Sequence, residues 1–430
     1  MGAAKICIIG AGPSGIGAAK SLLEAGLNDL TVFDRNDRVG GNWVYDPRPG
    51  HSSVYETAHA ISSRRLSQYD GFAMPADYPD YPSHVQLQLY FAACADRFGV
   101  TPLVRFNTEV TSTVPQNNGG WLVSSSGPAG QCTERFDYLL AANGHHWDPR
   151  MPNYPGEFAG QFMHAHSYKS AAPFAGKRVL VIGGGNSACD IAVETGRVAA
   201  RTCISMRRGY YFFPKFLFGR PIDVMGSKIR SWPRPLRQTL AKYALLLVQG
   251  GNRRYGLAAP DHEPLEQHPT LNSELLYFIR HGRVQPRSDV ARFEGRTVHF
   301  TDGRNEEFDA VIAATGYRMS FPFIDRSLVD FDRAAEIWLY LNIFHPRQRS
   351  LYFIGLVQPV GCIWPLSELQ ARIVAREIKG SWSRPADIDA RIRRQIARPH
   401  FRWAKTYRHA IEVDYHTYRR QLERELARAA

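Results

Sequence analysis

The first glycine-rich turn in this chain has the spacing needed to bring a phosphate group close to the backbone. Its sequence is GAGPSG, from Gly10 to Gly15. Gly10 permits a tight turn, Gly12 lets the backbone approach a pyrophosphate, and Gly15 lets a helix pack closely on a strand. The free N–H groups and the dipole of a helix that begins here bind phosphates. We therefore predict a dinucleotide site at Gly10, Gly12, Pro13, Ser14 and Gly15.

The same kind of turn occurs again in the middle of the chain, where the sequence GGGNSA occupies residues 183–188. An alanine is accepted at its last position, because only close packing is required there. Arg207 and Arg208 follow the next apolar run. Guanidinium groups pair bidentately with phosphate, so this arginine pair favours a dinucleotide that carries a 2′-phosphate, NADPH rather than NADH. The predicted contacts at this second turn are Gly183, Gly185, Asn186, Ser187, Arg207 and Arg208.

A carboxylate follows the first turn at the distance expected for a ribose ligand. Asp34 lies 24 residues after Gly10 and can accept hydrogen bonds from the hydroxyls of an adenosine ribose. The same negative charge repels a 2′-phosphate, which favours FAD or NAD over NADP at this turn. The two turns therefore predict two different nucleotides.

Each turn requires a strand before it and a helix after it. Residues 5–9 and 177–182 are short and almost wholly apolar, as is typical of strands buried in a parallel sheet. We expect helices over residues 16–25 and from 189 to about 198, and further strands over 30–33 and 202–206. This alternation predicts an α/β fold with two Rossmann-like dinucleotide-binding domains.

Two further motifs are similar to those of a known enzyme family. The sequence GGNW occupies residues 40–43, and the pattern FxGxxxHxxxY is matched from Phe158 to Tyr168. With these motifs the chain resembles the flavin-containing monooxygenases and their Baeyer–Villiger relatives. The standard Baeyer–Villiger enzymes end the second motif in tryptophan, so Tyr168 favours the former group. The resemblance implies that Gly41, Asn42 and Trp43 contact the flavin end of FAD.

The resemblance extends along nearly the whole chain and implies a domain layout. The FAD-binding domain would comprise residues 1–165 and 310–430, and the NADPH-binding domain, residues 166–309, would be inserted between these parts. A helical excursion at about 210–270 would shape the substrate entrance or serve packing alone. In related flavoproteins the backbone at the position of Val110 meets the adenine, Thr315 lies where the chain crosses between domains, and Gln370 lies near the flavin.

The resemblance also implies the chemistry of an NADPH-dependent FAD monooxygenase. Such an enzyme forms a C4a-(hydro)peroxyflavin that oxygenates soft nucleophiles such as sulfides and amines, or carbonyl compounds by Baeyer–Villiger insertion. The family usually has an asparagine beside the flavin, and the aligned position here holds Ile61, which cannot donate a hydrogen bond. Ser62 and Ser63 are the candidate substitutes. Without such a donor the oxygenated flavin would be short-lived and would release H₂O₂.

Two alternatives to a monooxygenase stay open at the level of the sequence. One is an NADPH oxidase or reductase that releases H₂O₂ without oxygen transfer, and Ile61 keeps this alternative open. The thioredoxin-reductase type of reductase is disfavoured, because the six cysteines form no CxxC pair. The other alternative is a sensor that binds both cofactors without turnover.

Composition limits the partners. The formal net charge is +13, but the basic residues are spread along the chain, as in a solvated surface or in a field that steers anionic ligands inward. We find no nucleic-acid-binding module, no metal-ligand cluster, no signal peptide and no membrane span in the sequence. We therefore expect a soluble cytoplasmic enzyme that acts on a small molecule and O₂ without nucleic acid or membrane. A homodimer is compatible with the sequence.

Overall fold

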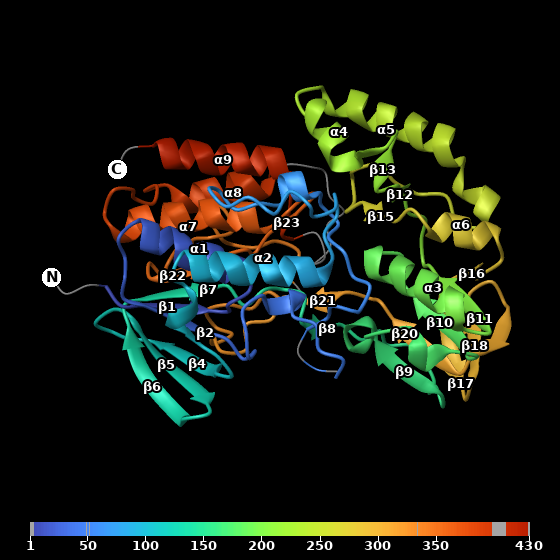
Figure 1. The fold of residues 1–430 in the computed structure, drawn as a ribbon, viewed down its shortest axis with the longest axis horizontal. Coiled ribbons are helices and arrows are strands. Elements are labelled where there is room, and N and C mark those ends of the chain that lie inside the picture. Colours follow the sequence, from blue (N-terminus) through green and yellow to red (C-terminus); the bar gives the residue numbers. More distant parts are fainter. Residues whose placement is uncertain (1–3, 49, 51, 333, 398–409, 429–430) are drawn as a thin grey trace. The chain divides into compact units, whose positions relative to one another are not determined.

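The computed structural model describes residues 4–48, 50, 52–332, 334–397 and 410–428. These residues form two compact units, each built around a five-stranded parallel sheet. The first unit comprises the residues up to Tyr45, the stretch Ser62–Asp148 and the residues from Arg318 on; the second comprises Asp46–Ile61 and Pro149–Tyr317. The prediction of an α/β fold with two Rossmann-like units is confirmed (Figure 1).

In the first unit the strand order is β22-β7-β1-β2-β3, and all neighbouring strands are parallel. The strands are β1 (Ile6–Ile9), β2 (Leu30–Phe33), β3 (Val104–Arg105), β7 (Tyr138–Ala141) and β22 (Leu351–Phe353). All four residues of the central strand β1 are buried. A strand covered on both faces has no solvent side, which is why its sequence is a continuous apolar run.

Helices and a second sheet cover the parallel sheet of the first unit. Helices α1 and α7 pack on each other, and α9 packs on α7 (Figure 1). An antiparallel sheet of β4, β5 and β6 shares one apolar core with the parallel sheet, in which Trp121 and Phe136 pack near Phe33. The bounds are α1 (Pro13–Glu24), α2 (His84–Arg97), α7 (Trp364–Ile378), α8 (Ile388–Ala397), α9 (Tyr415–Ala427), β4 (Glu109–Pro115), β5 (Trp121–Gly127) and β6 (Gly130–Phe136); β23 (Gln358–Pro359) and β24 (Glu412–Val413) form a short parallel pair.

In the second unit the strand order is β16-β11-β10-β20-β9, again all parallel. Its apolar strands carry the core that packs against a three-stranded antiparallel sheet, with Phe293, Phe300 and Phe308 at the centre. The bounds are β9 (Gln161–His164), β10 (Arg178–Ile182), β11 (Arg201–Ser205), β16 (Val284–Arg287), β20 (Ala310–Ala313), β17 (Val290–Glu294), β18 (Thr297–Phe300), β19 (Asn305–Glu307), α3 (Asn186–Val198) and α6 (Leu275–Arg280).

The excursion expected at 210–270 is partly helical. It contains α4 (Ile222–Lys228) and α5 (Arg234–Gln249), with the short strands β12 (Phe212–Phe213), β13 (Phe216–Leu217), β14 (Arg220–Pro221) and β15 (Thr270–Leu271). A small apolar cluster of Phe213, Leu245 and Leu271 holds α5 to the rest of the excursion. No helix in the described part of the chain is both long enough and apolar enough to cross a lipid bilayer.

Both cofactor-turn helices begin three residues earlier than their apolar patterns predict. Helix α1 begins at Pro13 rather than at residue 16, and α3 begins at Asn186 rather than at 189. The reason is that the last residues of each glycine turn themselves form the first helical turn. Gly12 and Gly185 are the N-cap residues in extended conformation, and Pro13 has the fixed φ that suits the first helical position.

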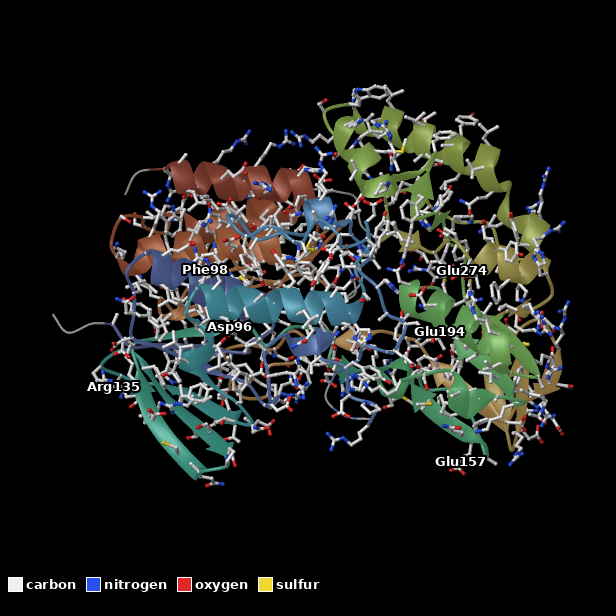
Figure 2. The ribbon with its side chains drawn as sticks, viewed as in Figure 1. Asp96, Phe98, Arg135, Glu157, Glu194 and Glu274 are labelled. Atoms are coloured by element: carbon white, nitrogen blue, oxygen red, sulfur yellow. The ribbon has the colours of Figure 1, made fainter. Side chains whose placement is uncertain are left out.

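A buried ion pair joins α1 to α7 in the first unit. Lys20 Nζ lies 2.5 Å from Glu368 Oε1, and the two side chains are only 1% and 2% exposed. The backbone N–H of Asp70 donates to the other Glu368 oxygen at 2.8 Å. Burial lowers the pKa of Lys20, but the hydrogen bonds and charges of Glu368 and Glu24 together outweigh this effect and raise it. The ring of Phe98, labelled in Figure 2, lies 4.7 Å from the ammonium.

We predict that Glu368→Gln lowers the free energy of unfolding by about 3 kcal/mol, because it leaves a buried ammonium without its main counter-ion. Asp37→Asn is the matched control, since the Asp37–Arg38 pair is more than half exposed and its loss costs about 1 kcal/mol or less. Urea unfolding of the two variants measures both values. Equal losses would show that the Lys20–Glu368 pair carries no special weight.

Candidate cofactor sites

The first glycine turn packs tightly against neighbouring backbone. Gly10 has a φ of +107°, and a Cβ atom there would lie 2.6 Å from the carbonyl oxygen of Ala142. A Cβ atom on Gly15 would lie 1.8 Å from the carbonyl oxygen of Gly10. No side chain fits at either position, so the strand, the turn and the helix α1 approach as closely as backbone allows.

The predicted loop at residues 40–43 lies directly against this turn. Gly41 has a φ of +55°, and a Cβ atom there would lie 2.7 Å from Cα of Gly12. Gly41–Trp43 form a short 3₁₀ helix, and the Trp43 ring packs edge-on against Trp364 at 6.3 Å between centroids. The structure thus brings the predicted contacts Gly12, Gly41, Asn42 and Trp43 together, with the N–H groups of the first turn of α1 beside them.

Asp34 lies at the end of β2 beside the same turn. Its Oδ2 accepts a hydrogen bond from the Ala11 N–H at 2.6 Å, and its Oδ1 accepts one from the Asn36 N–H at 2.7 Å. Burial raises the pKa of Asp34, and these two hydrogen bonds oppose that shift. A carboxylate has about four acceptor positions, so two remain for ribose hydroxyls. The N–H of Thr108 donates to the Asp34 carbonyl oxygen, which places the start of β4, and Val110 within it, next to this site.

Two predicted side chains of the first unit are used to hold its own backbone. Gln370, fully buried in α7, accepts from the Gly355 N–H and donates to the Tyr418 hydroxyl, both at 2.8 Å. Ser14 shares a hydrogen bond of 2.9 Å with Ser367, also on α7. A Cβ atom on Gly355 would lie 2.1 Å from Ser14 Oγ. Gln370 therefore fixes the Gly355 backbone against the start of α1.

The second glycine turn repeats the geometry of the first. Gly183 has a φ of +137°, and a Cβ atom there would lie 2.5 Å from the carbonyl oxygen of Ala314. Gly185 caps α3, and Asn186 and Ser187 form its first turn. The Asn186 side chain accepts from the Leu271 N–H at 2.7 Å, so it anchors β15 and leaves the backbone N–H groups of the turn for a phosphate.

The aromatic ring of Tyr210 packs on this second turn, a contact that was not predicted from the sequence. A Cβ atom on Gly184 would lie 2.2 Å from the Tyr210 ring, and the Thr270 hydroxyl donates to the Gly184 carbonyl at 2.9 Å. Tyr210 lies two residues after Arg208 in the sequence. An aromatic residue in that place was the only local sign of it.

The arginine pair lies just after β11, whose carboxyl end adjoins the second turn. The Arg207 side chain is exposed, and the Arg208 guanidinium stacks over the Tyr210 ring at 5.5 Å. The Nε–H of Arg208 is buried and has no hydrogen-bond partner among the described residues. A buried donor without a partner is costly, and a phosphate oxygen is a group that would satisfy it. The residues present therefore fit a 2′-phosphorylated dinucleotide.

Thr315 and His164 also lie in the second unit. The Thr315 hydroxyl donates to the Arg150 carbonyl at 2.6 Å, beside the carboxyl end of β20. His164 Nδ1 accepts from the His166 N–H at 3.0 Å, and burial lowers the pKa of His164 to about 4. The imidazole is therefore neutral near pH 7, which suits a structural role better than acid–base chemistry.

Ile61, Ser62 and Ser63, which the sequence predicts at the family asparagine position, lie where the chain passes from one unit to the other. Ile61, half-buried, is the last residue of a stretch in the second unit, and Ser62 is the first residue of the next stretch of the first unit. The Ser62 hydroxyl shares a hydrogen bond of 2.8 Å with Ser67. Ser63 is buried at 1% exposure.

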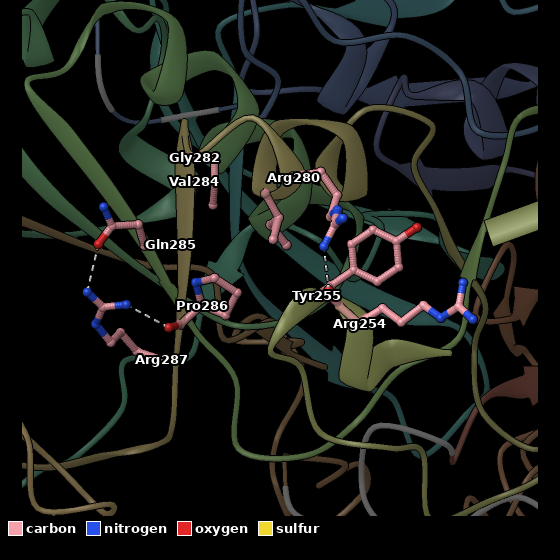
Figure 3. Close-up of a pocket in the computed structure, with 9 residues that line it drawn as sticks. Arg254, Tyr255, Arg280, Gly282, Val284, Gln285, Pro286 and Arg287 are labelled. Carbon is pink, nitrogen blue, oxygen red and sulfur yellow. Dashed lines mark hydrogen bonds between the residues drawn. The ribbon is translucent and has the colours of Figure 1, made fainter. Parts of the chain in front are cut away.

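A surface pocket of about 350 Å³ lies elsewhere in the second unit, along the edge strand β16. Figure 3 shows the Arg287 guanidinium bound to the Gln285 side chain and to the Pro286 carbonyl, and Arg280 donating to the Arg254 carbonyl. None of the predicted cofactor contacts lines this pocket. It is therefore separate from both glycine turns.

Comparison with solved structures places this architecture among known flavoprotein monooxygenases. The S-allyl-L-cysteine S-oxygenase of Allium sativum superposes with a TM-score of 0.72 at 24% identity, over 98% of this chain and 88% of that one. OTEMO in complex with FAD and NADP superposes with a TM-score of 0.73 at 18% identity, over 98% and 97% of the two chains. These likenesses establish the fold.

Sequence comparison establishes the family. The chain is 34% identical to flavin-containing monooxygenase 5 of Rattus norvegicus, over 96% of this chain and 81% of the relative. It is also 34% identical to flavin-containing monooxygenase 2 of Homo sapiens, over 90% and 75% of the two chains. The family model described as flavin-binding monooxygenase-like matches residues 3–428. The resemblance inferred from the motifs is confirmed: the chain belongs to the flavin-binding monooxygenase-like family.

Proposed function

We propose that this monooxygenase inserts one atom of O₂ into soft nucleophiles, sulfides or amines, or into carbonyl compounds by Baeyer–Villiger insertion. The second oxygen atom leaves as water, and NADPH supplies the two electrons. The observation that carries the proposal is the repeated turn: two backbone-closed glycine turns, one beside a carboxylate and one beside two arginines. The names of similar proteins, an N-oxide-forming monooxygenase, an S-oxygenase and cyclohexanone monooxygenase, support this range of substrates.

The first unit would hold FAD, and its residues supply binding and orientation. The N–H groups of Gly12, Ser14 and Gly15 lie in the region that would face the pyrophosphate. Pro13 has no N–H and instead starts α1. Asp34 would accept from the ribose and the Val110 backbone would meet the adenine. Gly41, Asn42, Trp43 and Gln370 would serve the flavin end. FAD supplies the hydride acceptor and the oxygen chemistry.

The second unit would hold NADPH in the same manner. Gly185, Asn186 and Ser187 would present backbone N–H groups to the pyrophosphate at the positive end of the α3 dipole. The Gly183 N–H donates to the Ser205 carbonyl at 2.9 Å, so Gly183 would serve the turn through its lack of a side chain. Arg207 and Arg208 would bind the 2′-phosphate. The unpartnered Nε–H of Arg208 supports this assignment, because a phosphate oxygen would remove the cost of a buried donor. In this proposal residues 166–309 remain the core of the NADPH domain, which also includes residues 46–61, 149–165 and 310–317, and the rest of residues 1–165 and 310–430 forms the FAD domain.

A homodimer formed through α5 is part of the proposal. The exposed face of this helix carries Leu236, Leu240, Tyr243 and Leu247, the last two 66% and 86% exposed. Two of its three charged side chains make ion pairs within the excursion, Arg234 with Glu266 and Lys242 with Glu263. An uncharged apolar stripe lets two copies of a chain with net charge +13 meet around a two-fold axis without like-charge repulsion. We propose that this dimer works in the cytoplasm, without nucleic acid or membrane.

Light scattering of Leu240→Glu/Leu247→Glu tests the dimer. We expect twice the monomer mass for the unchanged chain and the monomer mass for the variant, since a buried carboxylate opposes association. A monomer before substitution would remove the dimer from the proposal. Co-sedimentation of that monomer with anionic phospholipid vesicles would assign the α5 face to lipid instead.

The proposed activity is tested with FAD-loaded protein, NADPH and ¹⁸O₂ in the presence of a thioether, a tertiary amine or a cyclic ketone. We expect one ¹⁸O atom in the product of at least one substrate class, with NADPH consumed in step. NADPH consumption with stoichiometric H₂O₂ and no labelled product would establish the oxidase alternative. NADPH that fails to reduce the bound flavin would establish the sensor alternative.

Ile61→Asn tests the register at the family asparagine position. We expect the share of NADPH electrons that ends in H₂O₂ to fall about fivefold, the factor for one added hydrogen bond of about 1 kcal/mol. Ile61→Val is the control, because it changes volume without adding a donor. An unchanged share in Ile61→Asn would leave Ser62 and Ser63 as the residues to test.

Arg207→Gln/Arg208→Gln tests the second nucleotide. We expect the KM for NADPH to rise about tenfold or more, because charge-assisted hydrogen bonds to the 2′-phosphate are lost. The KM for NADH should change little, and so should both constants in the control Arg283→Gln, whose side chain is exposed elsewhere in the same unit. An equal rise for both nucleotides would contradict the 2′-phosphate assignment.

A further inference from the structure

A short segment of the second unit comes from an unexpected part of the chain. Residues 46–61 lie in the sequence between two stretches of the first unit, yet they pack with residues 149–317. This segment ends on Ile61, the residue at the family asparagine position. The contacts that hold the segment to the second unit therefore also set the position of Ile61, after which the chain passes back into the first unit.

Helix α3 holds the segment through two carboxylates one turn apart. The Tyr55 hydroxyl donates to Asp190 Oδ2 at 2.6 Å, and Asn272 donates to the other Asp190 oxygen at 2.6 Å. Four residues later, Glu194 accepts from the Thr57 hydroxyl and, at 2.7 Å, from the Tyr168 hydroxyl. Figure 2 labels Glu194 on α3. Residues i and i+4 share one face of a helix, so α3 presents both acceptors to the same segment.

Both carboxylates are partly buried. Burial raises the pKa of both Asp190 and Glu194, and the hydrogen bonds from Tyr55, Thr57 and Tyr168 oppose that shift. The Tyr55 and Tyr168 rings meet edge-on at 5.9 Å between centroids. Hydrogen bonds to charged acceptors in such surroundings are stronger than neutral ones, so the contacts hold the segment firmly.

The backbone of the segment is tied to the signature motif that ends in Tyr168. Lys169 Nζ donates to the carbonyl oxygens of Ser52 and Val54, and the Glu56 N–H donates to the Lys169 carbonyl at 2.9 Å. His166 Nε2 lies 2.5 Å from the Gly50 carbonyl oxygen. The motif and Lys169, the residue after it, thus bind the backbone of the segment, while α3 binds its side chains.

We propose that Asp190 and Glu194 are positioning residues for the oxygenation reaction. Helix α3 begins at the turn that would hold the NADPH pyrophosphate. Two carboxylates near its middle accept hydrogen bonds from residues 55 and 57. These two carboxylates therefore fix the segment that ends on Ile61 to the helix that begins at the second glycine turn. This inference rests on the proposed function for its consequence and on the contacts within the second unit for its mechanism.

Tyr55→Phe/Thr57→Val removes both donors while keeping the shape of the side chains. Hydrogen exchange followed by mass spectrometry should show about tenfold faster exchange in a peptide covering residues 52–61, the factor for losing charge-assisted hydrogen bonds, with α3 unchanged. In the FAD-loaded variant the share of NADPH electrons ending in H₂O₂ should rise while the KM for NADPH stays within about twofold. Tyr255→Phe, which removes a hydroxyl bound to the Gln249 carbonyl in the same unit, is the control for both readouts.

An unchanged rate of hydrogen exchange in residues 52–61 would show that the hydrogen bonds to α3 do not hold the segment. Faster exchange with an unchanged H₂O₂ share would leave the two carboxylates a purely structural role and overturn the positioning assignment. If neither the variant nor the unchanged protein consumes NADPH, the proposed function fails, while the exchange measurement still decides whether α3 holds the segment.

Discussion

The two halves of this molecule depend on one constraint, the contact of bare backbone with bare backbone at the end of a central strand. In each unit the first glycine of the turn meets a carbonyl that follows the neighbouring strand, Ala142 after β7 and Ala314 after β20. Any side chain at Gly10 or Gly183 would push those strands apart. The sheet order around the turn, the start of the helix and the approach of a phosphate all require that these contacts stay closed.

The sequence alone predicts the elements that obey local rules. The apolar runs and glycine spacing predict β1, β2, β10 and β11 and the two helices that follow the turns, because a buried parallel strand and a phosphate-binding turn leave marks within about thirty residues. The three-residue error at each helix start has a local reason as well: the hydrophobic pattern begins only after the first helical turn, whose residues belong to the glycine motif.

The contacts that could not be predicted are long-range and polar. Nothing near Lys20 indicates that its ammonium pairs with Glu368 across almost the whole chain, and nothing near Tyr55 indicates Asp190. Gln370 is a second example of a long-range polar contact. The resemblance implied that it lies near the flavin, and the structure shows its amide bound to Gly355 and Tyr418. A motif identifies which residues matter, whereas the partners of each residue depend on tertiary contacts that leave no periodic pattern.

The detour of residues 46–61 also affects how the chain folds as it is made. Tyr55 and Thr57 leave the ribosome well before Asp190 and Glu194, an interval on the order of ten seconds at ordinary elongation rates. Neither Rossmann-like unit is continuous, so the first must wait for α7 and the second must retain a segment synthesised early. High contact order of this kind slows folding, and a fragment limited to residues 149–317 would lack Tyr55 and Thr57, which donate to Asp190 and Glu194. Each unit has its own sheet and core, yet neither can be completed until chain that follows part of the other unit has been synthesised.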